Sequence, residues 1–200
     1  MSPRPQKVTD NQLFEAAYAV MNRVGPRELT LAAIAKEAGV TPAVIVQRFG
    51  SKRAMLVEFA KKYASGAEEL IAGLAQQHAS PLAAIRAYGR CMAGMAVSPA
   101  ALVRSLAYLQ NDLTDPALHK HLRRQAQGTN AGLRRLLEAA VRTGELSKGA
   151  NVRQLARTME AVVSGSMLSW AVHREGSAAD WMQRDLESVL APYLQARRRA

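Results

Sequence analysis

Helix starts are marked along this chain with a regularity that constrains its fold more than any other feature. Four capping residues are each followed directly by proline, at Thr41-Pro42, Ser80-Pro81, Ser98-Pro99 and Asp115-Pro116. The cap side chain accepts a hydrogen bond from a first-turn amide, and proline sets φ there without needing a hydrogen bond of its own. Further caps stand without proline, at Thr9, Thr30, Ser51, Asn151 and Ser177. This punctuation predicts about nine helices.

Apolar spacing and composition agree with an all-α fold. Phe14, Ala17, Tyr18 and Met21 recur at helical spacing in the first predicted helix. Hydrophobic residues make up 48% of the 200 residues and charged residues 22%, which is typical of a globular chain and excludes disorder. The β-branched triplet at 44–46 favours a strand by propensity, but the cap before it leaves room only for a short helix.

The charge balance points to a polyanionic partner. The formal net charge is +11, and residues 1–62 hold ten Lys and Arg against five Asp and Glu. A single cysteine, Cys91, excludes an intramolecular disulfide. No apolar run is long enough for a membrane span, and the first residues resemble a basic arm and not a signal peptide. We therefore expect a cytoplasmic protein.

Residues 30–49 have the layout of a helix-turn-helix motif. A helix of about eight residues is followed by a tight turn at Gly39-Val40 and a second short helix that opens at Thr41-Pro42. In such a motif the second helix can enter the major groove of DNA. The positions that would face each other inside the motif are apolar or small, namely Leu31, Ile34, Ala35, Ala38, Val40, Ile45 and Phe49.

Leu29-Thr30-Leu31, the run from Ile34 to Thr41, and the run from Phe49 to Leu56 together resemble the N-terminal signature of the tetracycline-repressor (TetR) family of bacterial regulators. The resemblance is specific over residues 9–63, and beyond them it extends only to helix number and pattern. It implies that residues 41–48 form the recognition helix. It also implies that Lys52, at the start of the next helix, lies on a phosphate, where a helix N-terminus and a cation favour an anion.

The recognition helix departs from the family pattern. Residues 43–46 read Ala-Val-Ile-Val where the family usually has Gly-Thr-Leu-Tyr, and Ala32 stands where a polar residue is common. We therefore expect apolar contacts to thymine methyls, with hydrogen bonds from Gln47 and Arg48 to bases or to phosphates. Arg48 and Lys52 could instead be ordinary solvated charges. The predicted DNA-binding residues are Thr30, Thr41, Pro42, Ala43, Val44, Gln47, Arg48 and Lys52.

The remaining two thirds of the chain carry no catalytic, nucleotide or metal signature, so we expect no enzyme, no cofactor and no metal site. His119 and His121 project from different sides of a helix and do not suit a shared metal. The family resemblance implies an effector pocket inside the helices between about residues 80 and 175. Its mainly apolar candidates favour a small hydrophobic effector, and they are Tyr88, Met92, Met95, Leu106, Leu109, Met167, Trp170 and His173.

The helix that starts at Asn151 has two faces that look buried. One carries Leu155, Met159 and Val163, while the other carries small residues, including Gly165 and Ser169, that suit close packing against another chain. The family resemblance implies that the last two helices pair with their symmetry mates in a dimer. The alternative is that both faces pack within one monomer. The candidate interface residues are Thr158, Val162, Gly165, Ser169, Leu186, Val189, Leu190 and Tyr193.

Taken together, the sequence predicts a homodimeric, ligand-responsive regulator, and we expect a repressor that a small effector releases from a palindromic double-stranded DNA operator. Residues 1–50 would form the helix-turn-helix domain, residues 51–77 a connecting helix that acts as a lever, and residues 78–200 the effector-binding and dimerisation domain. The alternative is a nonspecific or architectural nucleic-acid-binding protein, driven by net charge and the terminal Arg197-Arg198-Arg199. The effector, the operator and the choice between repression and activation are left open.

Overall fold

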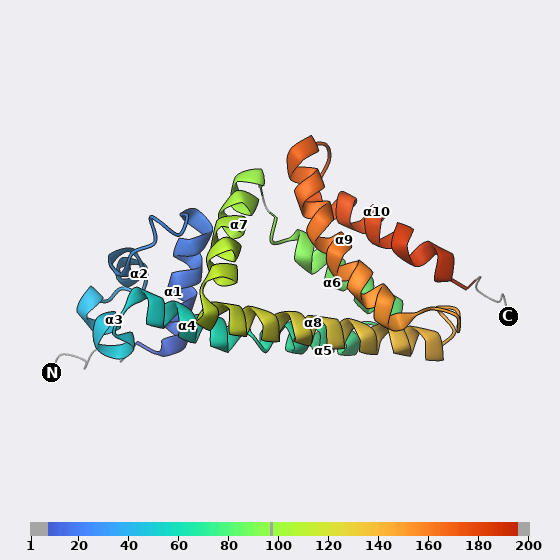
Figure 1. Ribbon diagram of the computed structural model, residues 1–200, viewed down its shortest axis with the longest axis horizontal. Coiled ribbons are helices and arrows are strands. Elements are labelled where there is room, and N and C mark those ends of the chain that lie inside the picture. Colours follow the sequence, from blue (N-terminus) through green and yellow to red (C-terminus); the bar gives the residue numbers. More distant parts are fainter. Residues whose placement is uncertain (1–7, 97, 196–200) are drawn as a thin grey trace. The chain divides into compact units, whose positions relative to one another are not determined.

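The computed structural model describes residues 8–96 and 98–195, and the all-α fold is confirmed for them (Figure 1). The basic arm and the terminal arginine triplet lie outside the described residues. The described part forms ten α-helices and one short 3₁₀-helix. Their bounds are α1 Asp10–Arg23, α2 Leu31–Glu37, α3 Pro42–Phe49, α4 Lys52–Tyr63, α5 Gly66–Gln77, α6 Pro81–Ala93, α7 Pro99–Thr114, α8 Pro116–Arg142, α9 Val152–His173, α10 Ala178–Leu190 and η1 Ala191–Tyr193.

All but one of the predicted capping residues act as the sequence predicts; the exception is Thr41, whose hydroxyl makes no capping hydrogen bond. Thr9 forms a reciprocal capping box with Gln12, and Ser177 forms one with Asp180. The Thr30 hydroxyl accepts a hydrogen bond from the amide of Ala33 at 3.0 Å. Single caps of the same kind start the helices after Ser51, Ser80, Ser98, Asp115 and Asn151. Local sequence therefore determines where nearly all of these helices begin.

One predicted helix is divided into two helices in the structure. We predicted a single helix from Ser51 to about Gln77, but α4 ends at Tyr63 and α5 begins at Gly66. Between them the amides of Glu68 and Glu69 both donate to the carbonyl of Ser65. Serine and glycine are poor helix formers, so the Ser65-Gly66 pair is a natural place for the break. This break raises the number of helices in the described residues from the expected nine to ten.

The chain packs as two compact units. The first contains the described residues up to Lys62 together with Val103–Leu122, and the second contains Tyr63–Leu102 and the residues from Arg123 onward. The first unit is built around fully buried apolar side chains, among them Leu13, Ile34, Ile45 and Met55. The predicted functional division at residues 50 and 77 does not coincide with these packing units, and it stays a prediction.

Within the first unit, α7 is fastened to the end of α1. The Tyr108 hydroxyl donates to the carbonyl of Val24 at 3.0 Å, and Arg104 Nε donates to the carbonyl of Asn22 at 3.0 Å. Partial burial, together with the charge of Glu28, raises the pKa of Tyr108 to about 12, so this hydroxyl keeps its proton at neutral pH. Residues 103–122 therefore pack with the helix-turn-helix segment.

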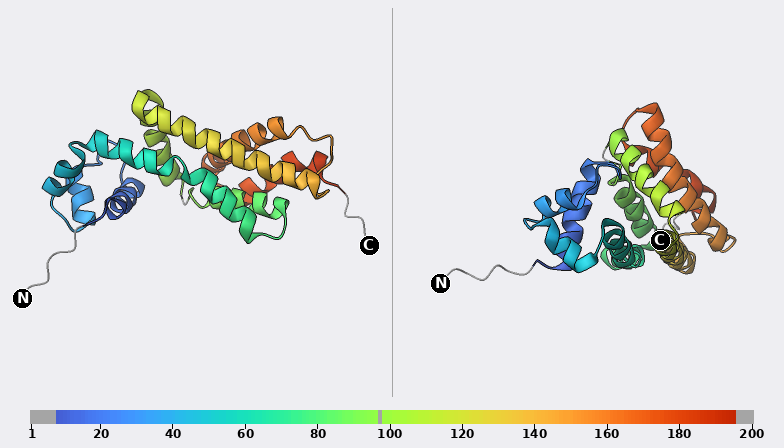
Figure 2. Two further views of the ribbon diagram at one scale, coloured as in Figure 1. Left: turned by 90° about the horizontal axis from the view of Figure 1, so that it is seen from below. Right: turned by 60° about the vertical axis from the view of Figure 1, so that its left-hand side comes forward.

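In the second unit, α9 and α10 form an antiparallel hairpin that also packs on α6 (Figure 2). Gly89 of α6 permits this close approach, because a Cβ at that position would lie 2.4 Å from Leu186 Cδ1. The turn of the hairpin is closed by two indoles: Trp170 Nε1 donates to the carbonyl of Gly176, and Trp181 Nε1 donates to that of Glu175. The core face predicted for α9 is confirmed.

Candidate nucleic-acid interface

The turn between α2 and α3 is a Schellman motif, as its glycine predicts. Gly39 has φ +67°, the left-handed region that glycine adopts without a steric penalty. The Val40 amide donates to the carbonyl of Ala35 at 2.9 Å, and the Gly39 amide donates to that of Lys36 at 3.3 Å. These bonds end α2 sharply and determine the direction in which α3 leaves the turn.

Helix α3 buries one side and exposes the other. Ile45 is 0% exposed and belongs to the apolar core of the unit, whereas Ala43 and Gln47 face solvent and Val44 is half-buried between them. Thr41 is exposed at the N-terminus of the helix, and its hydroxyl makes no capping hydrogen bond. Thr41, Ala43 and Gln47, three of the positions expected to meet DNA, are therefore exposed on the outward side of α3.

The sequence analysis missed one member of this outward face. Val46 is 46% exposed, which is unusual for a valine and places it beside Ala43 and Gln47. Residues three and four apart share a side of a helix, so the spacing 43, 46 and 47 could have identified it. Its apolar side chain adds to the surface available for contact with a thymine methyl.

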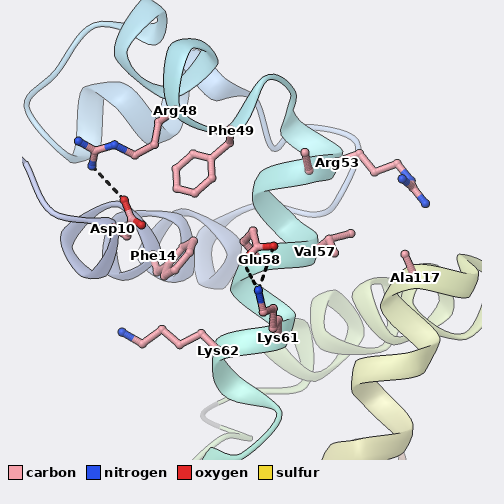
Figure 3. Close-up of a pocket in the computed structure, with 11 residues that line it drawn as sticks. Asp10, Phe14, Arg48, Phe49, Arg53, Val57, Glu58, Lys61, Lys62 and Ala117 are labelled. Carbon is pink, nitrogen blue, oxygen red and sulfur yellow. Dashed lines mark hydrogen bonds and ion pairs between the residues drawn. The ribbon is translucent and has the colours of Figure 1, made fainter.

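Arg48 is turned toward the start of α1. Its Nη1 donates to the carbonyl of Val8 at 2.6 Å and lies 3.1 Å from Asp10 Oδ1. Figure 3 shows the pair with Asp10. The guanidinium therefore fastens the first described residues to the end of α3. Both of these bonds come from Nη1, so the guanidinium keeps other donors for a contact with DNA, which stays a prediction.

Lys52 is held close to the protein. Its Nζ donates to the carbonyl of Leu29 at 2.8 Å, with the carbonyl of Pro26 at 3.5 Å, directly before α2. An ammonium group has three donors, so these contacts leave capacity for a phosphate. Thr30 uses its hydroxyl to cap α2 and lies on the exposed surface. Both residues stay predicted DNA contacts, and each has a structural role in addition.

A hollow of about 670 Å³ lies behind α3, and its floor is formed by Phe14 and Phe49, whose ring centroids are 5.7 Å apart (Figure 3). Its cationic side chains already have polar partners. The pairs are Arg48 with Asp10, Arg53 with Asp115, Lys61 with Glu58, and Lys62 with Asn11. Because three of these cations are paired with carboxylates and Lys62 is held by an amide, this hollow offers few free donors to an anionic ligand.

The predicted effector residues do not gather in one place. Tyr88 and Trp170 are buried in the core of the second unit, and Met92 and Met167 pack against that core. Burial and the neighbouring charge of Glu160 raise the pKa of Tyr88 to about 12. These four side chains therefore belong to the apolar packing of the second unit.

The other four predicted effector residues are placed differently. Met95 is 59% exposed, and His173 is exposed with its ring stacked on Trp181 at a centroid distance of 5.3 Å. Leu106 and Leu109 belong to the first packing unit. The eight residues therefore do not form one cluster within either unit.

The predicted dimer residues divide into two groups. Leu186 is 1% exposed and Leu190 is 0% exposed, because both fill the core beneath α6 and α9, so they are unable to contact a second chain and their assignment to the interface was wrong. The others lie nearer the surface and are half-buried, namely Thr158, Val162, Gly165, Ser169, Val189 and Tyr193. Only this second group remains a candidate interface.

Among residues 8–96 and 98–195, no group of three or more His, Cys, Asp or Glu side chains is placed to hold a metal ion. In the same part of the chain, none of the helices combines the length and apolar character that crossing a bilayer requires.

The sequence matches two family models. The first, described as bacterial regulatory proteins of the tetR family, matches residues 13–59. The second, described as the tetracyclin repressor-like C-terminal domain, matches residues 107–186. A comparison with curated proteins found no match.

Several solved structures share this fold along nearly the whole chain. A TetR transcription regulator from Haloarcula marismortui ATCC 43049 is 14% identical with a TM-score of 0.76, over 93% of this chain and 98% of that chain. SmeT, the repressor of the Stenotrophomonas maltophilia multidrug efflux pump SmeDEF, is 20% identical with a TM-score of 0.66, over 96% and 93%. The transcriptional regulator FadR from Bacillus subtilis, in complex with stearoyl-CoA, is 17% identical with a TM-score of 0.69, over 92% and 98%.

Proposed function

This chain belongs to the TetR family of bacterial regulatory proteins, and from that premise we propose that it is a ligand-responsive transcriptional repressor that binds a palindromic operator as a homodimer. The observation that carries the proposal is the outward face of α3. Ala43, Val46 and Gln47 are exposed on a short helix that a Schellman turn holds in a defined direction. A helix presented in this way fits the major groove of DNA.

The side chains of this face can recognise bases through both apolar contacts and hydrogen bonds. Ala43, Val44 and Val46 offer apolar surface for thymine methyls, and the amide of Gln47 can form two hydrogen bonds with an adenine. Thr41 at the N-terminus of α3 and Lys52 at that of α4 would contact phosphates on either side. Base contacts would supply sequence preference, and phosphate contacts would supply affinity and position.

The homodimer would form through the exposed side of α9. Gly165 stands on this side, and a Cβ added to it would meet nothing within 4 Å in the described chain. Nearby, Leu168 is 44% exposed and Val172 is 77% exposed. Apolar side chains gathered on one surface favour a protein partner, and a two-fold partner would use the same surface. Such a dimer would present α3 twice, as a palindromic operator requires.

Release from the operator would follow from unequal ligand binding. An effector must bind a conformation with unsuitable α3 spacing more tightly than the conformation that fits DNA. FadR from Bacillus subtilis carries stearoyl-CoA, which supports a small-molecule effector here without identifying it. In this chain α8 begins in the first packing unit and continues in the second, so a ligand held by its later turns would act on the unit that contains α3.

The proposal is tested by footprinting the purified protein on the DNA upstream of its own gene. We expect a protected palindrome whose half-sites lie about one helical turn apart. Protection without a palindrome, or of every DNA tested, would favour a nonspecific or architectural nucleic-acid-binding protein instead.

A further inference from the structure

A second, smaller hollow lies entirely within the second packing unit. It occupies about 370 Å³ between α8 and α9, the long lower helix and the helix above it in Figure 1. Its polar lining includes Arg123, Asn130 and Arg134 from α8 and Glu160 from α9. The three α8 residues are spaced by seven and four positions, so they project from one side of the helix.

A hydrogen bond joins the two helices at one edge of this hollow. Asn130 Nδ2 donates to Glu160 Oε2 at 2.8 Å, which ties α8 to α9. The other carboxylate oxygen, Oε1, accepts no hydrogen bond from the described residues. It therefore offers an acceptor to a hydroxyl or amine group in the hollow.

The two guanidinium groups have unused donors. Arg134 Nε is buried and has no hydrogen-bond partner in the described chain. Its nearest carboxylate is that of Glu138, 3.8 Å from Nη2, which is too long for a hydrogen bond. Arg123 makes no ion pair with any described residue. The two Nη groups of Arg134 donate no hydrogen bond to another described residue, and the side chain is 39% exposed, so these groups are available to a ligand in the hollow.

The contrast with the hollow behind α3 strengthens this interpretation. There, each cation has a polar partner from the protein. Here, two guanidinium groups face one carboxylate, and that carboxylate is already held by an amide. The net charge of the lining is positive, and neither guanidinium group donates a hydrogen bond to another described residue. These donors are available to an anionic ligand.

We propose that the hollow between α8 and α9 binds the carboxylate of a small organic acid that carries a hydroxyl or amine beside that carboxylate. Arg134 would take the carboxylate with its two Nη groups, a two-point geometry that guanidinium groups favour. Glu160 Oε1 would accept from the hydroxyl or amine. The apolar remainder of the acid would lie along Ala126 and Ala131 toward Arg123, about 16 Å away along the helix axis.

This inference rests on the proposed function only in calling the acid an effector; the site itself is argued from its lining. It also changes the expected chemistry of the ligand. The sequence predicted a hydrophobic effector from apolar candidates, whereas the hollow selects for a charged head with an apolar body. A neutral molecule of the same shape would lack the charge-assisted hydrogen bonds from the Arg134 Nη groups, so it would bind less tightly.

The test compares acids with their primary amides on the full-length protein. The probes are mandelate, phenylalanine and phenylacetate, each paired with its own amide, and binding is measured by calorimetry and by thermal shift. We expect each acid to bind more tightly than its amide, and mandelate more tightly than phenylacetate, which lacks the hydroxyl. Arg134→Met should weaken mandelate binding at least about tenfold.

Two variants control for folding and for general charge. Arg134→Lys keeps a cation and the stem but loses the planar fork, so mandelate should bind it with reduced affinity even if Arg134→Met is unfolded. Arg124→Met removes the same charge from an exposed position of α8 outside the hollow, and it should leave binding unchanged. The proposal is overturned if no acid binds more tightly than its amide, or if the acid preference survives in both Arg134 variants.

DNA binding is measured separately with the same samples. Acid binding by a protein that recognises no operator would support the site and contradict the proposed function. Operator binding by a protein that ignores all the acids would support the proposed function and contradict the site. The two failures are therefore distinguishable.

Discussion

Arg53 and Asp115 form a two-point ion pair, with Nε 2.6 Å from Oδ2 and Nη2 2.8 Å from Oδ1. The same Oδ1 accepts a hydrogen bond from the Ala117 amide at 2.9 Å. The Asp115 carboxylate thus caps α8 and also binds α4 at Arg53, the residue after Lys52. Because α8 continues into the second packing unit, this pair places an electrostatic contact between α4 and the first turn of the helix that lines the α8–α9 hollow.

The first prediction concerns the protonation of Asp115. Hydrogen bonding to Arg53 holds the pKa of Asp115 below its ordinary value of about 3.9. The stabilisation from this pair is therefore complete above the unfolded-state pKa and is lost as the pH falls through the lower folded-state pKa. A carboxyl NMR titration should show Asp115 titrating below about 3.9 in the native protein and closer to it in Arg53→Met. A native Asp115 that titrates at its ordinary value would contradict the pairing.

The second prediction uses two glycines of α8 that face α5. A Cβ at Gly128 would lie 3.5 Å from Glu68 Cβ, an ordinary contact, whereas at Gly132 it would lie 2.9 to 3.1 Å from three atoms of buried Ile71. Gly128→Ala should therefore stabilise the protein by up to about 1 kcal/mol through helix propensity. Gly132→Ala gains the same propensity but must displace Ile71, at a cost of about 1–3 kcal/mol, so it should destabilise the protein.

Urea unfolding of both glycine variants checks this contrast, since each changes one hydrogen to a methyl group on the same helix. Equal stability of the two variants would mean that α5 and α8 do not approach each other as closely as the structure indicates.

The third prediction separates reading of bases from attraction to phosphates. Val44→Ala and Gln47→Ala should change the preference among operator sequences, by about 1–3 kcal/mol at a single base pair for Gln47. Lys52→Ala should weaken binding to all sequences alike and lower the salt dependence by about one counterion. Affinities are measured by fluorescence anisotropy on an operator, its single-base variants and random DNA at several salt concentrations.

Circular dichroism of Lys52→Ala is the necessary control, because its ammonium group also holds the carbonyl of Leu29. If a folded Lys52→Ala protein altered sequence preference while Gln47→Ala weakened all sequences equally, the two assignments would have to be exchanged.

The fourth prediction addresses the dimer. Gly165→Arg should convert the protein to a monomer, because the added side chain finds open space within one chain but would occupy the proposed interface. Gln125→Arg places the same side chain on an exposed position of α8, which contributes no candidate interface residue, and it should remain dimeric. Size-exclusion chromatography with light scattering measures the mass of each. A dimeric, folded Gly165→Arg protein would remove this side of α9 from the interface.

The features that the sequence predicts well depend on residues close together in the chain. Thr9, Thr30 and Ser177 cap helices through amides three residues away, and Gly39 adopts the left-handed conformation that its turn requires. The break at Ser65 was missed because apolar spacing continues across it, and one such pair is tolerated inside many helices.

The features that the sequence did not predict depend on contacts between distant residues. Arg48 reaches Val8 across 40 positions, and Lys52 reaches Leu29 across 23, with no local pattern to indicate either. Periodicity identifies the apolar stripe of α10 but does not say which helix covers it, and for this reason Leu186 was assigned to the wrong surface. The α8–α9 hollow was not predicted because its polar edge joins Asn130 and Glu160, which are 30 positions apart in the chain.

The central claim is that the outward face of α3 recognises a particular DNA sequence. Competition binding at physiological salt measures this most directly, as the ratio of affinities for a selected operator and for random DNA of equal length. The account predicts a ratio of about a thousandfold or more, which falls sharply in Gln47→Ala. A ratio near one, with affinity that depends steeply on salt alone, would contradict it.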